Sequence, residues 1–336
     1  MKKLLAILLA LVMVLSFSTA MIASADELPE IKVVIPTAGG AQNIETLYTE
    51  KWMDLVTERT EGKVTFDYTN GGALGSYAEL VEGVNYGAYD MTVTDISQLE
   101  SYVPEVAIVG LPFLMKNYDH LKAVYGGEIW DWLQEKVESE SNMMIMTPYF
   151  CGFREILTVD QLKTLADCQN YLIRVPQVDA YIKSFNSIGF AYTTLAWSEC
   201  YTSMQTGVID GIETAVMSLY NSGFYDLGKY VLLSHHMQAV NTVLVNKDFW
   251  NKLPDQYKTI MLEAFDELKT QEWDECIGNE QYYREQMEAK GCEFSEFSPE
   301  DVQEVNKRVQ GYWDEVTSKI DGGAEIVEKI LAAAAE

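Results

Sequence analysis

Two arginines in this chain lie in apolar segments, where a charged side chain needs a partner. Arg174 is the middle residue of the run Leu172–Pro176, and Arg154 directly follows Gly152 and Phe153. A buried guanidinium is stable only beside an anion, and its planar fork holds a carboxylate through two parallel hydrogen bonds. That anion is either one of the 51 acidic side chains of the chain or the carboxylate of a small ligand, and the pattern itself leaves both open.

Residues typical of catalytic and metal sites are few and poorly spaced. Of the three histidines, His235 and His236 are adjacent and would point in different directions in a regular element. The sequence has no G-x-S-x-G, H-E-x-x-H or S-x-x-K motif, and no C-x-x-C pair. The glycines of Asn70–Gly75 lack the spacing of a dinucleotide loop. We therefore expect no metal and no cofactor, although a Cys/His nucleophile pair stays open.

The five cysteines are an odd number, so at least one thiol is unpaired. Free cysteine is among the most buried residue types, and we expect these residues to be structural. The one disulfide that we consider is Cys276–Cys292, whose spacing would suit a long helix that folds back.

The elements that must position Arg154 and Arg174 alternate between strand and helix. Apolar periodicity and stop residues predict a β-α-β-α-β order at 31–35, 44–59, 64–68, 80–86 (capped by Ser76) and 91–94. The second half predicts strands at 143–147, 172–175 and 208–214, with helices at 179–188, 199–206 (capped by Ser198), 255–290 and 299–329. This alternation is typical of an α/β fold with parallel strand pairs.

A short internal similarity suggests two related halves. A helix that ends at a glycine and leads through an aspartate into a strand occurs at Gly87–Asp90 and again at Gly207–Asp210. Two such copies predict two α/β lobes, and small ligands commonly bind in the cleft between lobes.

The composition is that of a globular protein with a strong negative charge. Of 336 residues 48% are hydrophobic, and the net charge is −27, which argues against nucleic-acid binding. Residues 1–25 combine Lys2 and Lys3, the apolar run Leu4–Phe17 and the small residues Ala23–Ala25. This pattern predicts a secretory signal peptide. We expect an exported protein, periplasmic or extracellular, with no lipid anchor.

Several segments together resemble the DctP-type substrate-binding proteins of tripartite ATP-independent periplasmic (TRAP) transporters. The resemblance extends over residues 31–320, and it rests on Gly72–Gly75, Gly87 with Asp90-Met91, Leu111–Leu114, Gly152–Arg154, Ile173–Pro176, Tyr201–Glu213 and Val245–Trp250. It implies an α/β, two-lobed periplasmic-binding-protein fold with a ligand cleft between the lobes and long C-terminal helices. Crossing strands and a long helix would join lobe I, residues 26–150 plus 237–275, to lobe II, residues 151–236 plus 276–336.

The resemblance also implies roles for individual residues. Arg174 matches the arginine that binds the ligand carboxylate in the family, and Arg154 matches a second arginine that often assists it. Thr214 stands where the family usually has an asparagine that faces the ligand, so this chain has a hydroxyl in place of an amide there. We expect the rings of Phe150 and Trp197 to form apolar walls, and we count Glu213 and Asn43 as further ligand-binding residues.

The function that follows is capture rather than catalysis. We expect a monomeric solute-binding protein that takes up a small organic acid with a partly apolar or planar body and delivers it to the TRAP membrane permease subunits. A C4-dicarboxylate stays open, with Arg154 binding its second carboxylate, whereas Thr214 argues against a heavily hydroxylated sugar acid. The alternatives are an exported carboxylate-handling enzyme and a ligand-sensing partner of a membrane receptor.

Overall fold

The computed structural model describes residues 28–334, so the predicted signal peptide lies outside the described residues. The chain starts with two parallel strands, β1 (Ile31–Pro36) and β2 (Val64–Thr69), in the register Ile31 to Val64. Helix α2 (Ile44–Arg59) connects them. Trp52 of α2 is fully buried and stacks on Phe265 at 4.4 Å, so this first β-α-β unit is held against a helix much later in the chain.

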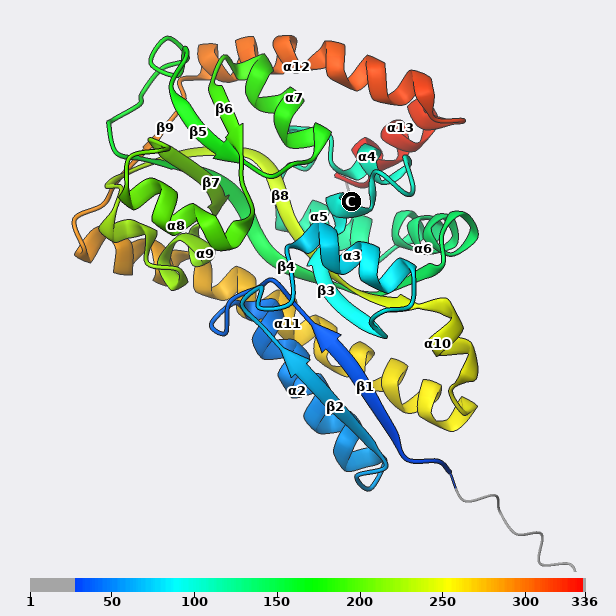
Figure 1. The fold of residues 1–336 in the computed structure, drawn as a ribbon. Coiled ribbons are helices and arrows are strands. Elements are labelled where there is room, and N and C mark those ends of the chain that lie inside the picture. Colours follow the sequence, from blue (N-terminus) through cyan, green and yellow to red (C-terminus); the bar gives the residue numbers. More distant parts are fainter. Residues whose placement is uncertain (1–27, 335–336) are drawn as a thin grey trace, which may run out of the picture.

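A second, larger sheet forms the centre of the molecule (Figure 1). Within the described residues it has seven strands in the order β3-β8-β4-β7-β5-β6, with β9 beside β8. Their bounds are β3 Met91–Asp95, β4 Met143–Thr158, β5 Leu172–Val175, β6 Ala191–Thr194, β7 Gly211–Ala215, β8 Tyr230–Asn246 and β9 Glu293–Glu296. β5 pairs in parallel with β6 and β7, whereas β8 is antiparallel to β3 and β4.

The antiparallel pair β4 and β8 crosses the whole molecule. At one end of the pair, where Met143 of β4 lies opposite Asn246 of β8, strand β3 pairs with β8. At the other end, where Thr158 lies opposite Tyr230, strand β7 pairs with β4. The register shifts three times along it, between Ile145 and Pro148, Phe150 and Gly152, and Arg154 and Ile156. Each shift bends and twists the strand locally. These two strands connect a first group of elements around β1, β2 and β3 with a second group around β5, β6 and β7.

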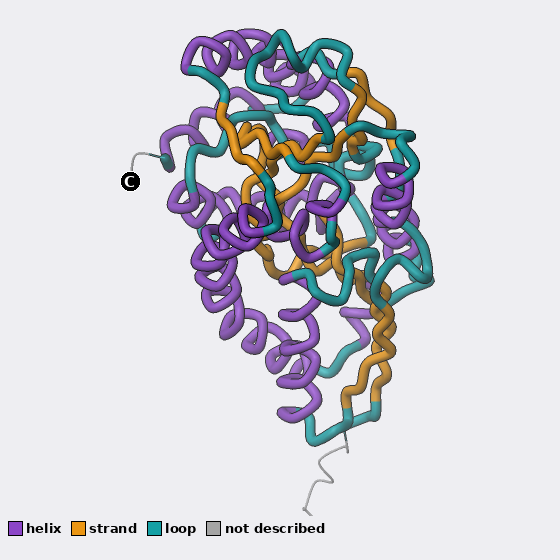
Figure 2. The backbone as a smooth tube through the Cα atoms, turned by 90° about the vertical axis from the view of Figure 1, so that its left-hand side faces the viewer, coloured by secondary structure: helices purple, strands orange, loops and turns teal. Residues whose placement is uncertain are grey.

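Helices cover both sides of the central strands (Figure 2). The helices of the first half are α3 Tyr77–Asn85, α4 Val106–Val109, α5 Tyr118–Tyr125 and α6 Glu128–Glu140, with a 3₁₀ turn at Ile96–Leu99. Those of the second half are α7 Asp179–Ile188, α8 Trp197–Gln205, α9 Val216–Asn221, α10 Lys247–Lys252, α11 Asp255–Ala289, α12 Pro299–Lys319 and α13 Gly323–Ala333, with a 3₁₀ turn at Phe224–Asp226.

Two C-terminal features bear on the predicted lobes. Helix α11 packs on α2, on β4 and on α9, and thus connects both groups of elements. Helix α12 packs on α7 and α4, and α13 packs on α4 and α5. Helices α4 and α5 belong to residues predicted for lobe I. The residue boundaries of the two lobes remain a prediction.

Local signals set most helix boundaries as predicted. Ser76 caps α3 in a reciprocal capping box with Glu79, and α7 ends at Gly189, whose φ is +112°. Two predictions are wrong. Ala196, not Ser198, precedes α8, and its backbone N–H donates to the Glu199 side chain. The predicted helix 299–329 is two helices, because Ile320 is extended after the last residue of α12 and Gly322, with a left-handed φ of +69°, precedes α13.

The one disulfide considered from the sequence, Cys276–Cys292, is not formed, since all five cysteines are free and buried. Cys276 lies within α11, and about 13 helical residues separate it from the end of that helix. At 1.5 Å per residue this is roughly 20 Å of helix, whereas a disulfide needs Cα atoms within about 7 Å. Helix α11 continues past Cys276 to Ala289 instead of folding back, so the two thiols do not meet.

Candidate functional site

A pocket lies where the two groups of elements face each other. Its volume is about 140 Å³, enough for about ten water-sized groups, because one water needs roughly 10–15 Å³. The lining residues come from the start of α2, the start of α3, β3 with the 3₁₀ turn after it, the crossing strands, β5, the start of α8, and β7 with α9. A ligand in it would touch both groups of elements.

Arg174 supplies a buried cation to this pocket. It lies on β5 between Thr193 of β6 and Ile212 of β7, and it is 5% exposed. Its Nε and Nη2 donate to the Leu195 carbonyl oxygen at 2.9 and 2.6 Å, and its guanidinium lies 6.0 Å from the Trp197 ring centre. Among residues 28–334 the structure gives Arg174 no carboxylate within ion-pair distance. The charge thus lacks a counter-ion from the protein.

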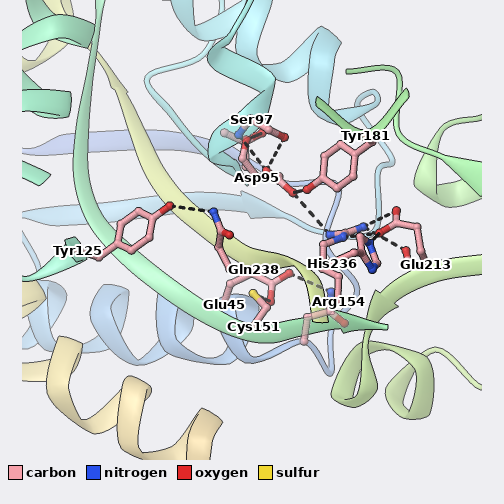
Figure 3. A network of polar contacts seen from close by, with 12 residues as sticks. Glu45, Asp95, Ser97, Tyr125, Cys151, Arg154, Tyr181, Glu213, His236 and Gln238 are labelled. Carbon is pink, nitrogen blue, oxygen red and sulfur yellow. Dashed lines mark hydrogen bonds and ion pairs between the residues drawn. The ribbon is translucent and has the colours of Figure 1, made fainter. Parts of the chain in front are cut away.

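Arg154 lines the same pocket but already has protein partners (Figure 3). Its Nε and Nη2 bond the Glu213 carboxylate at 2.6 and 2.7 Å, and Nη1 lies 3.7 Å from Asp95. Burial is the largest influence and acts to raise the pKa of Glu213, but Arg154 and His236 together outweigh it and hold that pKa below its ordinary value. The ion pair is bidentate and buried, so the Arg154 charge is met within the protein.

A network of hydrogen bonds fixes Arg154 in place. His236 Nε2 lies 3.2 Å from Glu213, and burial lowers the pKa of this histidine. Asp95 accepts from the backbone N–H and hydroxyl of Ser97 and from the Tyr181 hydroxyl, the last at 2.9 Å. Figure 3 shows this network around Arg154, to which β3, β7 and β8 contribute Asp95, Glu213 and His236, α7 contributes Tyr181, and the 3₁₀ turn after β3 contributes Ser97. The guanidinium is therefore held in one orientation.

Glu45 is a pocket residue that the sequence did not single out. It lies in the first turn of α2 and is 3% exposed. Its carboxylate accepts from Asn43 Nδ2 at 2.9 Å, and the Cys151 thiol lies 3.7 Å away. Burial raises the pKa of this carboxyl, and hydrogen bonds from Asn43, Cys151 and Asn241 act against that rise. A first-turn acid is ordinary at a helix start, so no sequence signal separated it from a structural residue.

The structure brings together five of the seven predicted ligand-binding residues: Asn43, Arg154, Arg174, Trp197 and Thr214 line the pocket. Glu213 does not line it and lies behind Arg154. Phe150 does not line it either, and its ring stacks on Trp273 of α11 at 4.4 Å. Successive side chains alternate between the faces of a strand, so Cys151 faces the pocket while Phe150 faces α11. The ligand-binding role of the five lining residues remains a prediction.

The pocket also holds amides that the sequence analysis overlooked. Gln98, Gln177 and Asn241 line it together with Asn43. Thr214 in place of an asparagine therefore does not leave the site without amides, and the argument from Thr214 against a hydroxylated ligand fails.

Within residues 28–334 no group of three His, Cys, Asp or Glu side chains could hold a metal ion. In the same residues no helix combines the length and apolar character needed to cross a membrane.

Comparison with known proteins agrees with the geometry. A family model, described as bacterial extracellular solute-binding protein, family 7 (DctP), matches residues 37–320. The chain is 28% identical to solute-binding protein NAS141_03721 of Sulfitobacter sp. over 65% of this chain and 66% of that one. It is 25% identical to the C4-dicarboxylate-binding protein DctB of Bacillus subtilis, over 85% and 81%.

The fold matches solved structures as well. The sugar acid binding protein DctPAm of Advenella mimigardefordensis, solved with galactonate, superposes with a TM-score of 0.86 over 92% of this chain and 99% of that one, at 21% identity. The two-lobed α/β fold predicted from the resemblance is thereby confirmed. With a family model that spans most of its length, the chain belongs to the bacterial extracellular solute-binding protein family 7, DctP.

Proposed function

We propose that this chain is the solute-binding protein of a TRAP transporter, which captures a small organic acid outside the cytoplasm and delivers it to the membrane permease subunits. The observation that carries the proposal is Arg174, a nearly buried cation in a pocket between two groups of elements, without a carboxylate partner among the described residues. A ligand carboxylate would supply the missing anion.

The Leu195 carbonyl supports this role for Arg174. It accepts from Nε and Nη2, so it fixes the plane of the guanidinium before a ligand arrives. A side chain that is already ordered loses little rotamer freedom on binding, and this preorganisation favours affinity. The Trp197 ring, 6.0 Å from the guanidinium, would form one wall beside the bound acid.

The relatives support a carboxylate as the ligand. One is named for binding C4-dicarboxylates, and another was solved with galactonate. These compounds differ in size and in hydroxyl content but share an ionised carboxyl group. We extend only that shared feature to this chain, together with export by the predicted signal peptide of residues 1–25, a location in the periplasm or outside the cell, and a monomeric state.

Capture and catalysis predict different outcomes in one experiment. The purified protein is screened by thermal shift against a panel of small organic acids, and each acid that stabilises it is titrated by calorimetry. We expect one acid bound per chain, and the acid should be recovered unchanged after prolonged incubation. Conversion of the bound acid into a product would contradict the proposal, as would failure of every carboxylate to bind.

A further inference from the structure

The charged side chains that line the pocket can balance the charge of one ligand carboxylate. Two arginines line it, and two acids, Glu45 and Asp95, line it as well. The fork of Arg154 is taken by Glu213, and Asp95 lies 3.7 Å from its remaining nitrogen. Arg174 is therefore the one cation lining the pocket that has no acidic partner in the described part of the chain. A second ligand carboxylate would find no free cation there.

In its ionised form, Glu45 would repel a second carboxylate. Its oxygens contact an amide and a thiol, and no cation of residues 28–334 lies within ion-pair distance of it. Asp95 lines the same pocket, and its oxygens are engaged by Ser97 and Tyr181. A like charge placed against a buried carboxylate opposes binding. Glu45 is nonetheless suited to accept a hydrogen bond from a neutral hydroxyl, because Asn43, Cys151 and Asn241 occupy fewer than the roughly four acceptor positions of a carboxylate.

Other polar groups of the pocket are similarly uncommitted. The side chains of Gln98, Gln177 and Ser218 line it, and none has a hydrogen bond to another described residue. Asn43 and Asn241 add amides beside Glu45. A purely apolar ligand body would strip water from these groups without replacing its hydrogen bonds, which is costly. Ligand hydroxyls would replace them.

We propose that Glu45 is a specificity-determining residue, which accepts a hydrogen bond from a ligand hydroxyl, and that the ligand is a hydroxylated monocarboxylate rather than a dicarboxylate. Arg174 binds the carboxylate, while Glu45 with the neighbouring amides binds the hydroxylated part. This inference rests on the proposed function, since it assigns the ligand class of the same pocket. It replaces the earlier expectation that Arg154 binds a second carboxylate.

A matched series of six-carbon acids tests the ligand class on the wild-type protein. Hexanoate has one carboxylate and no hydroxyl, adipate has two carboxylates, and the aldonates gluconate, galactonate and gulonate have one carboxylate and five hydroxyls each. Calorimetry should show at least one aldonate binding about tenfold or more tighter than hexanoate and adipate. Equal or tighter binding of adipate or hexanoate overturns the proposal, and so does failure of all three aldonates at millimolar concentration.

The variant Glu45→Gln tests the residue itself. It keeps the shape and one acceptor oxygen but removes the charge, so the preference for the aldonate over adipate should fall by about tenfold. The matched control is Glu50→Gln, which removes the same charge from the same helix outside the pocket lining and should leave the preference unchanged. A glutamate that only stabilises the helix start would change thermal stability but not this ratio. An unchanged ratio in Glu45→Gln overturns the role of Glu45.

The failure of this inference is distinguishable from failure of the proposed function. If adipate binds tightly and Arg174→Ala abolishes that binding, the protein captures carboxylates but the hydroxylated class is wrong. If no carboxylate binds at all, both proposals fail.

Discussion

At the scale of single residues, the two arginines that look alike in the sequence have different surroundings. Both lie on buried strands and both line the pocket. Arg154 is matched by Glu213 through two short hydrogen bonds, whereas Arg174 donates only to the neutral Leu195 carbonyl. A buried cation is stabilised by an anion. Of these two arginines, only Arg174 has no acidic partner among the described residues.

We predict that Arg174→Ala weakens binding of the organic acid by roughly thirtyfold to a few thousandfold, because the ligand carboxylate loses its buried partner at a cost of about 2–5 kcal/mol. Arg174→Lys should also lose much of the affinity, since a point charge cannot reproduce the planar fork. Calorimetry measures both effects, and thermal unfolding checks that each variant is folded. The control Arg284→Lys changes an arginine that pairs with Glu288 on the surface of α11. Affinity within threefold of wild type in folded Arg174→Ala would show that the ligand is anchored elsewhere.

At the scale of elements, the crossing strands are held in shape by buried carboxylates. Glu272 of α11 accepts from the Phe150 backbone N–H at 2.9 Å, beside one register shift of β4. Glu155 accepts from the N–H groups of Ser234 and His235 at 2.6 and 3.0 Å, beside the register shift between Arg154 and Ile156. Each shift leaves backbone donors without a ladder partner. These glutamates satisfy them, which explains acidic side chains in the interior.

Gly152 permits one of these shifts. Its φ is +108°, a conformation that other residues rarely adopt, and an added Cβ would lie 3.3 Å from the Tyr118 hydroxyl. We predict that Gly152→Ala lowers the free energy of unfolding by about 1–3 kcal/mol. Denaturant titration measures the change. The control Gly278→Ala, inside α11 with no atom near the new Cβ, should instead stabilise the protein by about 0.5–1 kcal/mol. An unchanged free energy of unfolding in Gly152→Ala would mean that this register shift does not require glycine.

Glu272 makes stability depend on pH. Burial raises its pKa well above the ordinary value, so the folded state binds a proton more tightly than the unfolded state does. The contribution of Glu272 to the free energy of unfolding is then complete at pH values below its pKa in the unfolded state. It declines as the pH rises towards the pKa of the folded state.

We therefore predict that Glu272→Gln, which removes this titration, gains stability relative to wild type as pH rises from about 5 to about 8. Denaturant titrations across this range measure the difference. The control is Glu263→Gln, which makes the same substitution at an exposed position on the same helix and so separates the effect of the buried site from that of the substitution itself. A difference for Glu272→Gln that stays constant or shrinks with rising pH would contradict the assignment.

At the scale of the whole molecule, the pocket is built from two groups of elements that the chain joins through β4, β8 and α11 (Figure 1). Glu45 and Asn43 come from the first group, and Arg174, Trp197 and Thr214 come from the second. A ligand that contacts both walls binds best when they are close together. Differential affinity of this kind is what shifts a two-state equilibrium towards closure.

We predict that the bound acid makes the protein more compact. Small-angle X-ray scattering should give a smaller radius of gyration with saturating ligand than without it. The variant Arg174→Ala provides the control, because the same concentration of acid should leave its profile unchanged. Identical wild-type profiles at saturation would show that the two walls do not move towards each other on binding.

Much of the architecture is readable in the sequence because it depends on local signals. The bounds of α2 and α7 follow from apolar periodicity and end residues, and the capping box of Ser76 and Glu79 is a local pattern. Arg174 stands out for a local reason too, since a charge within an apolar strand is unusual. The family resemblance added the two-lobed fold, which periodicity does not specify.

Only the tertiary structure decided which polar groups meet. Arg154 and Glu213 are 59 residues apart, and Cys151 and Glu45 are 106 apart, so no local pattern could pair them. Phe150 and Cys151 are neighbours, yet the strand turns one towards α11 and the other towards the pocket. The sequence determined that a cation is buried in a strand. Whether that cation has a partner depends on the packing of β5, β7 and α8, because counter-charges are matched through space.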